Sequence, residues 1–467
     1  MAGIPIEPGT AQWSSRFAFI MAAVGSSVGL GNLWRFSAEL GTNGGAAFLL
    51  VYLACIICVG IPVLMGEYII GRAGQAASAV GSADDLSRRS GVSGFWSSGA
   101  WFGMIASFLI VSFYCVVAAW VLAYIPKFLF GSFNGQTPAE IAGQFGTLVS
   151  DGEGSVAAKM KGVLPYFLFF GLLTTWLVSR GVNKGIETAA RLLMPLFFLL
   201  LIGLAAYSII QGLSANANGV VGTQKAIGFM FSPDFSKITP EVAISALGQA
   251  CFSIGIGNAI MITYGSYLPR NVDIPKAAVT VASIDTLVAI TAGLAIFPIV
   301  FSHDLDFSAG AGIFFQTLPT ALGGTTGGNI VGAGFFFLAF FAAITSSVSL
   351  LEPTVAYVSE KLKMAKAKAA WLTGIAMMLL GLGSLFSGKF FDFIDQVLAG
   401  PLLAPMSALL ISLFVGWRLD RKILADEIAG DSVKLGRAIV MLTKFVAPVF
   451  MGLVLVFGIW GKYGPPY

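Results

Sequence analysis

Two short stretches combine glycines, small hydroxyl residues and an asparagine inside long apolar segments. They read GSSVGLGN at residues 25–32 and SIGIGN at residues 253–258. Each glycine weakens a helix by about 1 kcal/mol relative to alanine. Irregular backbone at membrane depth is tolerated where it lines a cavity or is buried in protein. The chemistry that such breaks allow is the binding of an ion or small solute by carbonyls, amides and hydroxyls.

The composition places these stretches in a membrane protein. Hydrophobic residues make up 57% of the 467 residues, glycine adds another 57 residues, and only 11% are charged. A soluble domain is about 45–50% apolar with glycine included and about 25% charged. The composition therefore excludes soluble catalytic modules and nucleic-acid binders, and a net charge of +4 is too small to imply an anionic partner.

Hydropathy predicts an all-α integral membrane protein with about eleven transmembrane helices. The whole chain, 1–467, forms a single transmembrane domain without room for a soluble one. The predicted spans are 16–40, 46–71, 101–130, 164–179, 187–210, 241–267, 275–301, 331–362, 369–386, 390–417 and 438–460.

The basic residues predict the orientation. Most of the 27 Lys and Arg residues fall on the side of the N-terminus, and cytoplasmic loops carry such an excess. We therefore expect a multi-pass protein of the cell (inner) membrane, with its N-terminus in the cytoplasm and its C-terminus outside. The longest outside connections, 131–162, 211–240 and 302–330, are rich in Gly, Ser and Thr and would form caps or lids.

The two breaks occupy the first and sixth predicted spans. These places correspond if the first ten spans form two repeats of five, at about 13–211 and 240–417, followed by an extra helix at about 438–460. Breaks in corresponding positions of two halves are the best pointer that a sequence offers to a transporter binding site. The repeat is not visible in residue identities, only in the positions of the breaks.

The cysteines and the one histidine carry little chemistry. Cys55 and Cys58 have the spacing of a redox or zinc motif, but they lie in an apolar helix without further Cys or His nearby. Packing on a helix face is the simpler interpretation. His303 lies in a predicted outside loop, where a solvated residue is more common than a metal ligand.

With these residues established, the chain resembles the neurotransmitter:sodium symporter family, in particular bacterial members with the leucine-transporter-like fold. The most specific match is GLGNLWRF at residues 29–36, followed by NGGAAF at 43–48. Further matches are GIP at 60–62 with Glu67, ITYGSY at 262–267 and TSS at 345–347. Gly185 and Pro195 match the family's Gly-nine-residues-Pro pattern, which lets the fifth helix unwind. The resemblance implies a 5+5 inverted repeat with broken helices 1 and 6.

The resemblance implies two sodium sites and no organic cofactor. The second site of the family would use backbone carbonyls and hydroxyls of Gly25, Val28, Ala342, Thr345 and Ser346, all uncharged. The first site would use Ser27, Asn32, Ser253 and Asp285, and a substrate carboxylate would complete it.

The resemblance also implies a substrate site at the two breaks. The substrate carboxylate would meet the amides of Leu30 and Gly31 and the hydroxyl of Tyr114, since helix ends carry partial charges of the required sign. The other expected substrate-binding positions are Ser26, Ser27, Ile110, Phe252, Ser253, Gly255, Asn258, Ser346, Ser349 and Leu350.

Arg35 and Asp395 match the family's outer gate pair, with Phe252 as an aromatic lid. Charges inside a bundle are costly unless paired, and a purely structural ion pair is the alternative. Glu360 supplies the acid of the family's inner gate. The Arg expected before Trp13 is absent, because the sequence there reads Thr10-Ala11-Gln12. Inner closure must therefore differ.

Two departures bear on function. Asp285 and Ala289 stand where chloride-dependent members have Asn and Ser, so an ionised Asp285 would supply the anion and remove the need for chloride. A neutral Asp285 that acts as an Asn substitute is the alternative. Gly255 stands where many members have Ser, a feature of members that take β- or γ-amino acids or taurine-like compounds, and Asn258 replaces a bulky apolar residue.

The sequence thus predicts a sodium-coupled symporter, not an enzyme, that imports an amino acid by alternating access. Uptake of a β- or γ-amino acid or a taurine-like solute is the alternative within transport. An intramembrane hydrolase with Ser346 or Ser347 as nucleophile lacks a base, because the only histidine lies in an outside loop. A channel would not need a paired gate over a composite site. The expected partners are a small amino-acid-like solute and the lipid bilayer, without nucleic acid.

Overall fold

The computed structural model describes residues 12–74, 76–151, 155–305, 312–323, 325 and 327–463. Within these ranges the regular elements are helices, and a single isolated β-bridge joins Ala215 and Val221. The all-α membrane fold expected from the sequence is confirmed.

Eight helical segments among the described residues are long and apolar enough to cross a membrane. Three of them are the single helices α14 (Ile274–Ser302), α16 (Gly328–Lys361) and α17 (Lys366–Phe386). The other five are composed of consecutive elements: 46–74 of α3 (Ala46–Cys55), η2 (Ile56–Gly60) and α4 (Ile61–Gly74); 94–129 of η3 (Gly94–Ser97) and α6 (Ser98–Leu129); 182–211 of η4 (Val182–Glu187) and α10 (Thr188–Gln211); 388–418 of α18 (Gly388–Phe393), η7 (Ile394–Leu403), α19 (Ala404–Leu413) and η8 (Phe414–Arg418); and 433–458 of α21 (Val433–Phe445) and α22 (Ala447–Tyr463).

The remaining predicted spans are broken or bent. The first consists of α1 (Arg16–Ser27), η1 (Gly31–Arg35) and α2 (Phe36–Thr42), with a bend of 57°. The fourth predicted span is α9 (Leu164–Ser179), which follows α8 (Ser155–Gly162) at a bend of 49°. The sixth consists of α12 (Pro240–Ile254) and α13 (Ile260–Ser266). All eleven predicted spans therefore correspond to helices, two of them interrupted by the expected breaks.

The first break begins where Val28 leaves the helix with an extended backbone, φ −72° and ψ 99°. The Ser27 hydroxyl donates to the carbonyls of Ala23 and Ile254, both at 3.1 Å. This side chain stabilises the end of α1 and ties it to the end of α12. Hydroxyl side chains can satisfy backbone groups that a broken helix leaves free, and Ser27 does so for the Ile254 carbonyl.

The second break requires unusual backbone angles. Gly255 and Gly257 have φ of 72° and 76°, and Ala259 has φ of 56°. A side chain at Gly257 would collide with the Ala404 carbonyl, so only glycine fits there. The Gly257 amide donates to the buried Glu67 carboxylate at 2.6 Å. The unwound segment is thereby held in place by an acidic side chain from α4.

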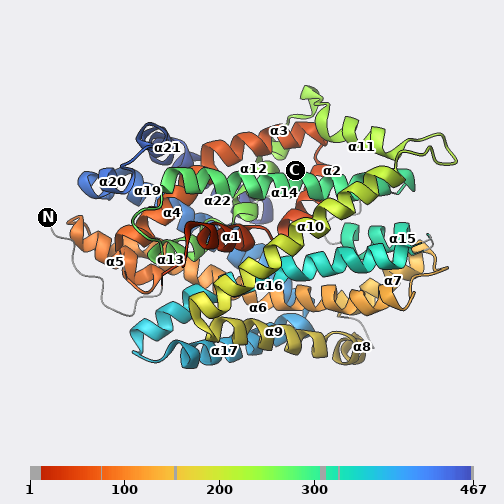
Figure 1. The fold of residues 1–467 in the computed structure, drawn as a ribbon, viewed down its shortest axis with the longest axis horizontal. Coiled ribbons are helices and arrows are strands. Elements are labelled where there is room, and N and C mark those ends of the chain that lie inside the picture. Colours follow the sequence, from red (N-terminus) through yellow and green to blue (C-terminus); the bar gives the residue numbers. More distant parts are fainter. Residues whose placement is uncertain are drawn as a thin grey trace.

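The long helices pack around these breaks. In Figure 1, α1 lies near the centre, surrounded by α10, α14 and α16. Helix α16 packs along α6, and α13 packs along α4. The two broken spans therefore occupy the middle of the bundle.

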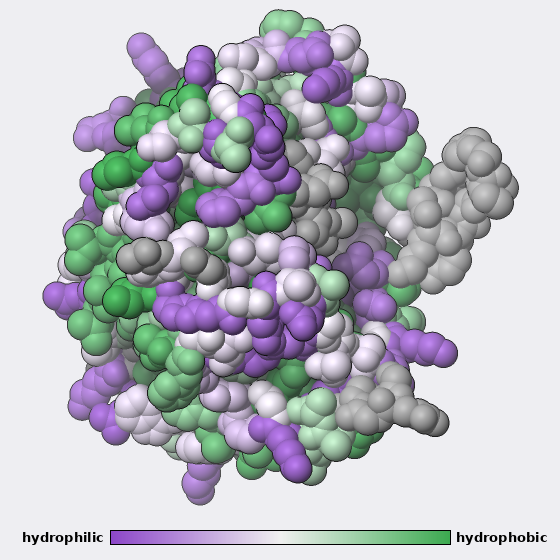
Figure 2. Space-filling view, turned by 90° about the vertical axis from the view of Figure 1, so that its right-hand side faces the viewer, coloured by the Kyte–Doolittle hydropathy of each residue, from purple (hydrophilic) through white to green (hydrophobic). Residues whose placement is uncertain are grey.

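Short helices cover the two ends. One end, here called the α5 end, carries α5 (Ala79–Arg89) and α20 (Arg421–Glu427), at the left of Figure 1. The opposite end, the α11 end, carries α7 (Pro138–Val149), α11 (Gly222–Phe231), η5 (Phe235–Lys237), η6 (Ile313–Thr317) and α15 (Leu318–Leu322). Figure 2 looks onto the α11 end, where hydrophilic side chains gather across the middle of the face. The sequence predicted the segments of the α11 end only as outside connections that would form caps or lids.

Candidate functional site

A fully buried polar cluster joins the two breaks to α14. Asn32 Nδ2 donates to Asp285 Oδ1 at 2.8 Å and to Ser253 Oγ at 3.0 Å. The Ser253 hydroxyl donates to Asp285 Oδ2 at 2.6 Å. None of the three is more than 1% exposed. The structure thus brings together three of the four residues predicted for the first sodium site. Ser27, whose carbonyl was predicted as the remaining ligand, bonds the neighbouring Ile254 carbonyl through its hydroxyl.

Each of these groups is further constrained. Asn32 Oδ1 accepts the Gly29 amide at 3.0 Å, which fixes the orientation of the Asn32 amide. The Tyr52 hydroxyl donates to Ser253 Oγ at 3.2 Å. Because a carboxylate and hydroxyl oxygens converge in a water-excluded place, the cluster has the hard oxygen donors that suit a small alkali cation.

A second oxygen cluster lies where the first break meets α16. The Ser346 hydroxyl lies 3.3–3.5 Å from the carbonyl oxygens of Gly25, Ser26 and Val28. Thr345 Oγ1 lies 3.1 Å from the Ala342 carbonyl. A Cβ atom at Gly29 would approach Ser346 Oγ to 2.9 Å, so glycine permits this close packing. The residues predicted for the second site therefore lie together, and their oxygens carry no net charge.

The predicted substrate residues form two groups. At the first break, the Leu30 amide lies 3.4 Å from the Tyr114 hydroxyl, and a Cβ at Gly31 would lie 2.6 Å from the Phe252 ring. At the second break, Phe252, Asn258 and Ile110 line a cavity of about 300 Å³. Gly255 lies between the lining residues Phe252 and Ile256, and the atom nearest to an ideal Cβ there is Asn258 Nδ2, at 4.0 Å.

Ser349 and Leu350 lie on α16 and are not among the residues that line this cavity. Leu350 is 6% exposed. The Ser349 hydroxyl is bonded to Tyr264 Oη at 2.6 Å and to the Thr345 carbonyl at 2.8 Å. Ser349 lines a different and much smaller cavity with Ala22, Ala189 and Thr345. Direct contact between Ser349 and a substrate stays a prediction.

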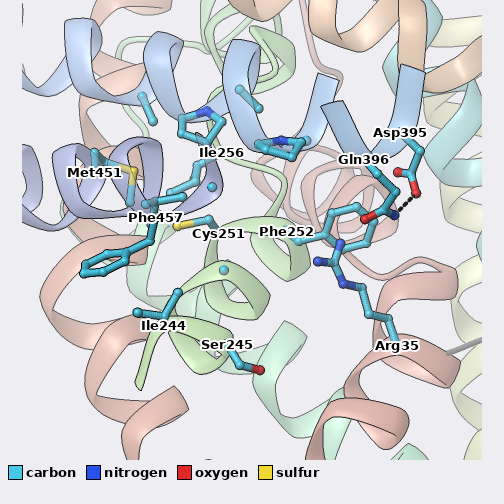
Figure 3. Close-up of a pocket in the computed structure, with 18 of the residues that line it drawn as sticks. Arg35, Ile244, Ser245, Cys251, Phe252, Ile256, Asp395, Gln396, Met451 and Phe457 are labelled. Carbon is cyan, nitrogen blue, oxygen red and sulfur yellow. Dashed lines mark hydrogen bonds between the residues drawn. The ribbon is translucent and has the colours of Figure 1, made fainter. Parts of the chain in front are cut away.

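The predicted outer gate lies on the large cavity. Figure 3 shows the Arg35 guanidinium against the Phe252 ring, with the guanidinium carbon 4.2 Å from the ring centroid. Asp395 lies on the same cavity and accepts a hydrogen bond from the Gln396 amide (Figure 3). A cation over an aromatic face is attracted by the ring quadrupole. Arg35, Phe252 and Asp395 therefore share one wall of the cavity.

The α5 end is closed by direct bonds. The Trp13 indole donates to the Tyr264 carbonyl at 3.0 Å, and its backbone amide donates to the Tyr267 carbonyl at 3.2 Å. Glu187 accepts the Ser14 backbone amide at 3.1 Å and also the Ser14 hydroxyl. The segment before α1 is therefore fastened to α13 and to the start of α10.

Two acids of α16 also act at this end. Glu360 accepts the Ser78 amide at 2.7 Å, at the start of α5. The buried Glu352 pairs with Lys366 and accepts the Tyr267 hydroxyl at 2.8 Å. Glu360 thus fastens α5 to α16 in this structure, and its role in a gate stays a prediction.

Sequence reasoning missed several residues that hold the site. Glu67, Tyr52 and Glu187 were assigned no role, and Gln249, whose Nε2 donates to the Gly31 carbonyl at 3.2 Å, was not noticed. Glu67 gave a signal, because an acid inside a span is costly and is usually functional. The hydroxyl of Tyr52 gave none, since its partner is 201 residues away.

The fold and these clusters define a transporter of the broken-helix type. Residues 10–143 and 155–466 match the family described as "Sodium:neurotransmitter symporter family". The chain belongs to this family, whose members are sodium-coupled transporters and not enzymes.

Individual relatives agree over nearly the whole chain. An uncharacterised sodium-dependent transporter of Bacillus subtilis, YhdH, is 34% identical over 96% of this chain and 96% of its own length. A sodium- and chloride-dependent betaine transporter of Caenorhabditis elegans is 25% identical over 74% of this chain and 62% of its own. The crystal structure of MhsT in complex with L-phenylalanine is similar with a TM-score of 0.83 and 39% identity, over 96% of this chain and all of that one.

Proposed function

We propose that this protein imports an amino acid together with sodium by alternating access. The observation that carries the proposal is the Asn32–Ser253–Asp285 cluster, which joins both broken helices to α14. Because its members come from three helices, an ion bound there would hold them in one arrangement. The similarity to MhsT, solved with L-phenylalanine, supports an amino acid as the solute.

The test is uptake into proteoliposomes with an imposed sodium gradient. We expect saturable accumulation of a radiolabelled amino acid that disappears when potassium replaces sodium. The variant Asp285→Ala removes the carboxylate of the cluster. Thr280→Ala, which removes a hydroxyl of the same helix that bonds the Lys276 carbonyl, serves as the control. Passive, non-accumulating flux would contradict the proposal.

We infer that two sodium ions bind, one at each oxygen cluster. The second cluster presents the Ser346 hydroxyl and carbonyls of α1, which suit an ion that must bind and leave. A Hill coefficient near 2 for sodium in substrate binding would support two ions. With Ser346→Ala we expect the coefficient to fall toward 1, whereas an unchanged coefficient would contradict this assignment.

We also propose that uptake does not require chloride. An ionised Asp285 would itself supply the buried anion, and its carboxylate lies 2.6 Å from the Ser253 hydroxyl that contacts Tyr52. Uptake in gluconate-based, chloride-free buffer should equal uptake in chloride. A collapse of uptake in gluconate would show that Asp285 acts as a neutral Asn substitute.

A β- or γ-amino acid or a taurine-like solute is the second candidate. The observation in its favour is Gly255, which contributes no side chain beside the cavity. We would measure how strongly β-alanine, γ-aminobutyrate and taurine compete with a labelled substrate, and compare this with competition by α-amino acids of similar size. The class that competes more strongly is the substrate class.

We place the α5 end in the cytoplasm of a cell whose inner membrane holds the protein. Arg72, Arg88, Arg89 and Arg270 lie at or near this end, in keeping with the positive-inside rule. The segment before α1 would then be cytoplasmic, and the end of α22 would lie outside. Single-cysteine labelling with a membrane-impermeant reagent on intact cells tests both assignments.

A further inference from the structure

The last span begins with a helix that turns basic and aromatic side chains outward. Helix α21 follows α20 in the chain and lies with it toward the left of Figure 1. Its buried residues include Ile439 and Thr443. Arg437, Met441 and Phe445 are exposed on the opposite face, at intervals of four residues. This face is covered by no other element among the described residues.

Lys444 is held on an aromatic platform at the edge of this face. Its Nζ lies 4.3 Å from the centroid of the Trp417 ring and 5.3 Å from that of Phe445. The Trp417 Nε1 donates to the Lys444 carbonyl at 2.9 Å, and the two rings meet edge to face at 5.4 Å. Trp417 is 55% exposed and Phe445 is 49% exposed. The platform is therefore preformed, and it attracts the ammonium at the surface of the protein.

The position of Lys444 along the span places it at the level of lipid headgroups. No charged residue stands between Lys444 and Lys462 in the sequence. At 1.5 Å per residue this stretch is about 27 Å long, close to the roughly 30 Å of a hydrocarbon core. Trp417 ends the preceding span at the same level, because it bonds the Lys444 carbonyl. A tryptophan in this position is typical of a membrane–water interface.

The cations of this face lack an anionic partner within the described part of the chain. Neither Arg437 nor Lys444 takes part in any of its ion pairs. The buried Glu427 of the preceding helix α20 pairs with Arg72 of α4 instead. Arg437 and Lys444 stand seven residues apart, so they lie two turns apart on the same side of α21. The exposed Arg418, next to Trp417, adds a further positive charge.

An apolar stripe continues the face into the membrane. Val449, Leu453 and Val456 of α22 are exposed and recur every three or four residues after Phe445. Cations at the headgroup level followed by such a stripe match the two parts of a negatively charged phospholipid. Basic residues beside the end of a span attract anionic lipids in this way.

We propose that Arg437 and Lys444 bind the phosphate of an anionic phospholipid, whose acyl chain lies along Phe445, Val449 and Leu453. This inference goes beyond the proposed function, because it assigns a bound lipid rather than a transported solute. In the orientation proposed above, the lipid belongs to the inner leaflet. The apolar stripe is what distinguishes a lipid from a free phosphate as the occupant.

The experiment measures lipid binding to the full-length protein in detergent by native mass spectrometry. The probes are phosphatidylglycerol and phosphatidylcholine with identical acyl chains, so that they differ in headgroup charge. We expect phosphatidylglycerol to bind at least fivefold more tightly. Excess glycerol 3-phosphate, which has the charged group without the chains, should not displace it.

Matched double variants locate the site. In Arg437→Gln with Lys444→Gln, the ratio of the two affinities should fall below twofold. The control, Lys361→Gln with Lys368→Gln, removes the same charge from two exposed residues at the α5 end. These residues lie on α16 and α17, and α17 is on the opposite side of the bundle from α21 (Figure 1). The control should retain the preference.

Several outcomes would overturn the inference. These are equal affinities for the two lipids in the wild type, a preference that survives in Arg437→Gln with Lys444→Gln, and an equal loss in the control. Displacement by glycerol 3-phosphate would show a site for free phosphate and would overturn the lipid assignment. If the double variant does not fold, Lys444→Gln alone should lower the ratio at least twofold, and an unchanged ratio would overturn the proposal. Sodium-coupled uptake is tested separately and does not depend on these outcomes.

Discussion

The two ends of the central site differ in open volume. Toward the α11 end, the cavity beside Phe252 and Asn258 has a volume of about 300 Å³. Toward the α5 end, the cavity beside Thr345 and Ser349 has a volume of about 10 Å³, which holds one water at most. The space beside Phe252 and Asn258 is therefore larger than the space beside Thr345 and Ser349, and a further cavity of about 560 Å³ lies at the α5 end between α5 and Glu360.

The two ends also differ in how they are held. At the α5 end, Trp13 and Ser14 make four hydrogen bonds, two to carbonyls of α13 and its end and two to Glu187. At the α11 end, Arg35 and Phe252 meet by stacking. The α11 side has hydrogen bonds as well, from the Ser245 hydroxyl to Glu39 at 2.6 Å and from Gln249 Nε2 to the Gly31 carbonyl at 3.2 Å. The α5 end differs in that its bonds fasten the segment before α1. The Arg that the resemblance implies before Trp13 is absent, and the contacts of Trp13 and Ser14 hold this segment in the structure.

Two engineered cysteines measure this difference in a background without the four native cysteines. Ala189→Cys lies on the small cavity and reports the α5 end. Ser245→Cys lies on the large cavity, in the second turn of α12, and reports the α11 end. Labelling rates with a small thiol reagent give the accessibility of each.

Removal of the Trp13 ring should have the largest effect. Trp13 is 3% exposed and packs on Tyr264 with ring centroids 5.1 Å apart. Truncation of a buried Trp to Ala costs about 3–5 kcal/mol. In Trp13→Ala we expect labelling of Ala189→Cys to rise at least tenfold and sodium-driven uptake to be lost. In Trp13→Phe, which keeps a ring, the labelling rate should lie between those of the wild type and Trp13→Ala. Unchanged labelling in Trp13→Ala would show that other contacts close this end.

Loss of the Glu187 carboxylate should have the next largest effect. Glu187→Ala leaves the Ser14 amide and hydroxyl without their acceptor. Because Ser14 is exposed and water can replace the acceptor, the expected cost is about 0.5–1.5 kcal/mol per hydrogen bond. Labelling of Ala189→Cys should rise three- to tenfold. Arg191→Gln removes only the largely exposed ion pair to Glu187, at 3.4 Å, and should change labelling less than twofold. Equal effects of the two variants would mean that the ion pair, not the Ser14 contact, matters.

Truncation of Phe252 should act at the α11 end with a smaller effect. Phe252→Ala removes the ring that stacks on Arg35, a contact worth about 0.5–1 kcal/mol or more where water is excluded. Because this end is already open, labelling of Ser245→Cys without substrate should change less than twofold. Protection of that cysteine by substrate should weaken three- to fivefold. A large increase without substrate would contradict the view that the ring is only a lid.

The smallest effect is expected at Asp151, outside the membrane spans. Its carboxylate accepts the Gly388 amide at 2.9 Å and pairs with Lys159 at 3.3 Å. The Gly388 N–H holds the pKa of Asp151 below its usual range. Because this pKa is lowered in the folded state, the contribution is present at neutral pH and lost as pH falls through that value. In Asp151→Asn, hydrogen exchange of amides 388–393, measured at neutral pH, should rise less than threefold. Acidification should remove the difference between this variant and the wild type.

The sequence predicted those features that depend on the residues of a single helix, such as its hydropathy and its glycines. Hydropathy placed α9 at its observed bounds, and the glycines at 29, 31, 255 and 257 marked both breaks. The fifth span begins five residues earlier than predicted, because the polar Asn183 and Lys184 of η4 conceal it. Helix α7 was predicted as a loop segment, although Thr137 and Glu140 form a capping box that marks its start.

Contacts between distant segments were beyond the sequence. Glu67 bonds Gly257 across 190 residues, and Glu352 pairs with Lys366 because a turn after α16 brings the lysine back. The resemblance named Glu360 as the inner acid but gave no hint of the Ser14–Glu187 contact. Partners of this kind depend on how helices cross, which periodicity and composition do not encode.

The last helix adds a consequence for the surrounding lipid. Only 22% of the apolar window of the last span is buried, yet Met451, Val454 and Phe457 of α22 line the large cavity. One side of this helix is therefore exposed on the surface of the bundle, while the other bounds the large cavity. The cavity wall on this side is one helix thick. We therefore expect bilayer thickness and lateral pressure, and with them the lipid composition, to affect the shape of the cavity and its preference among solutes.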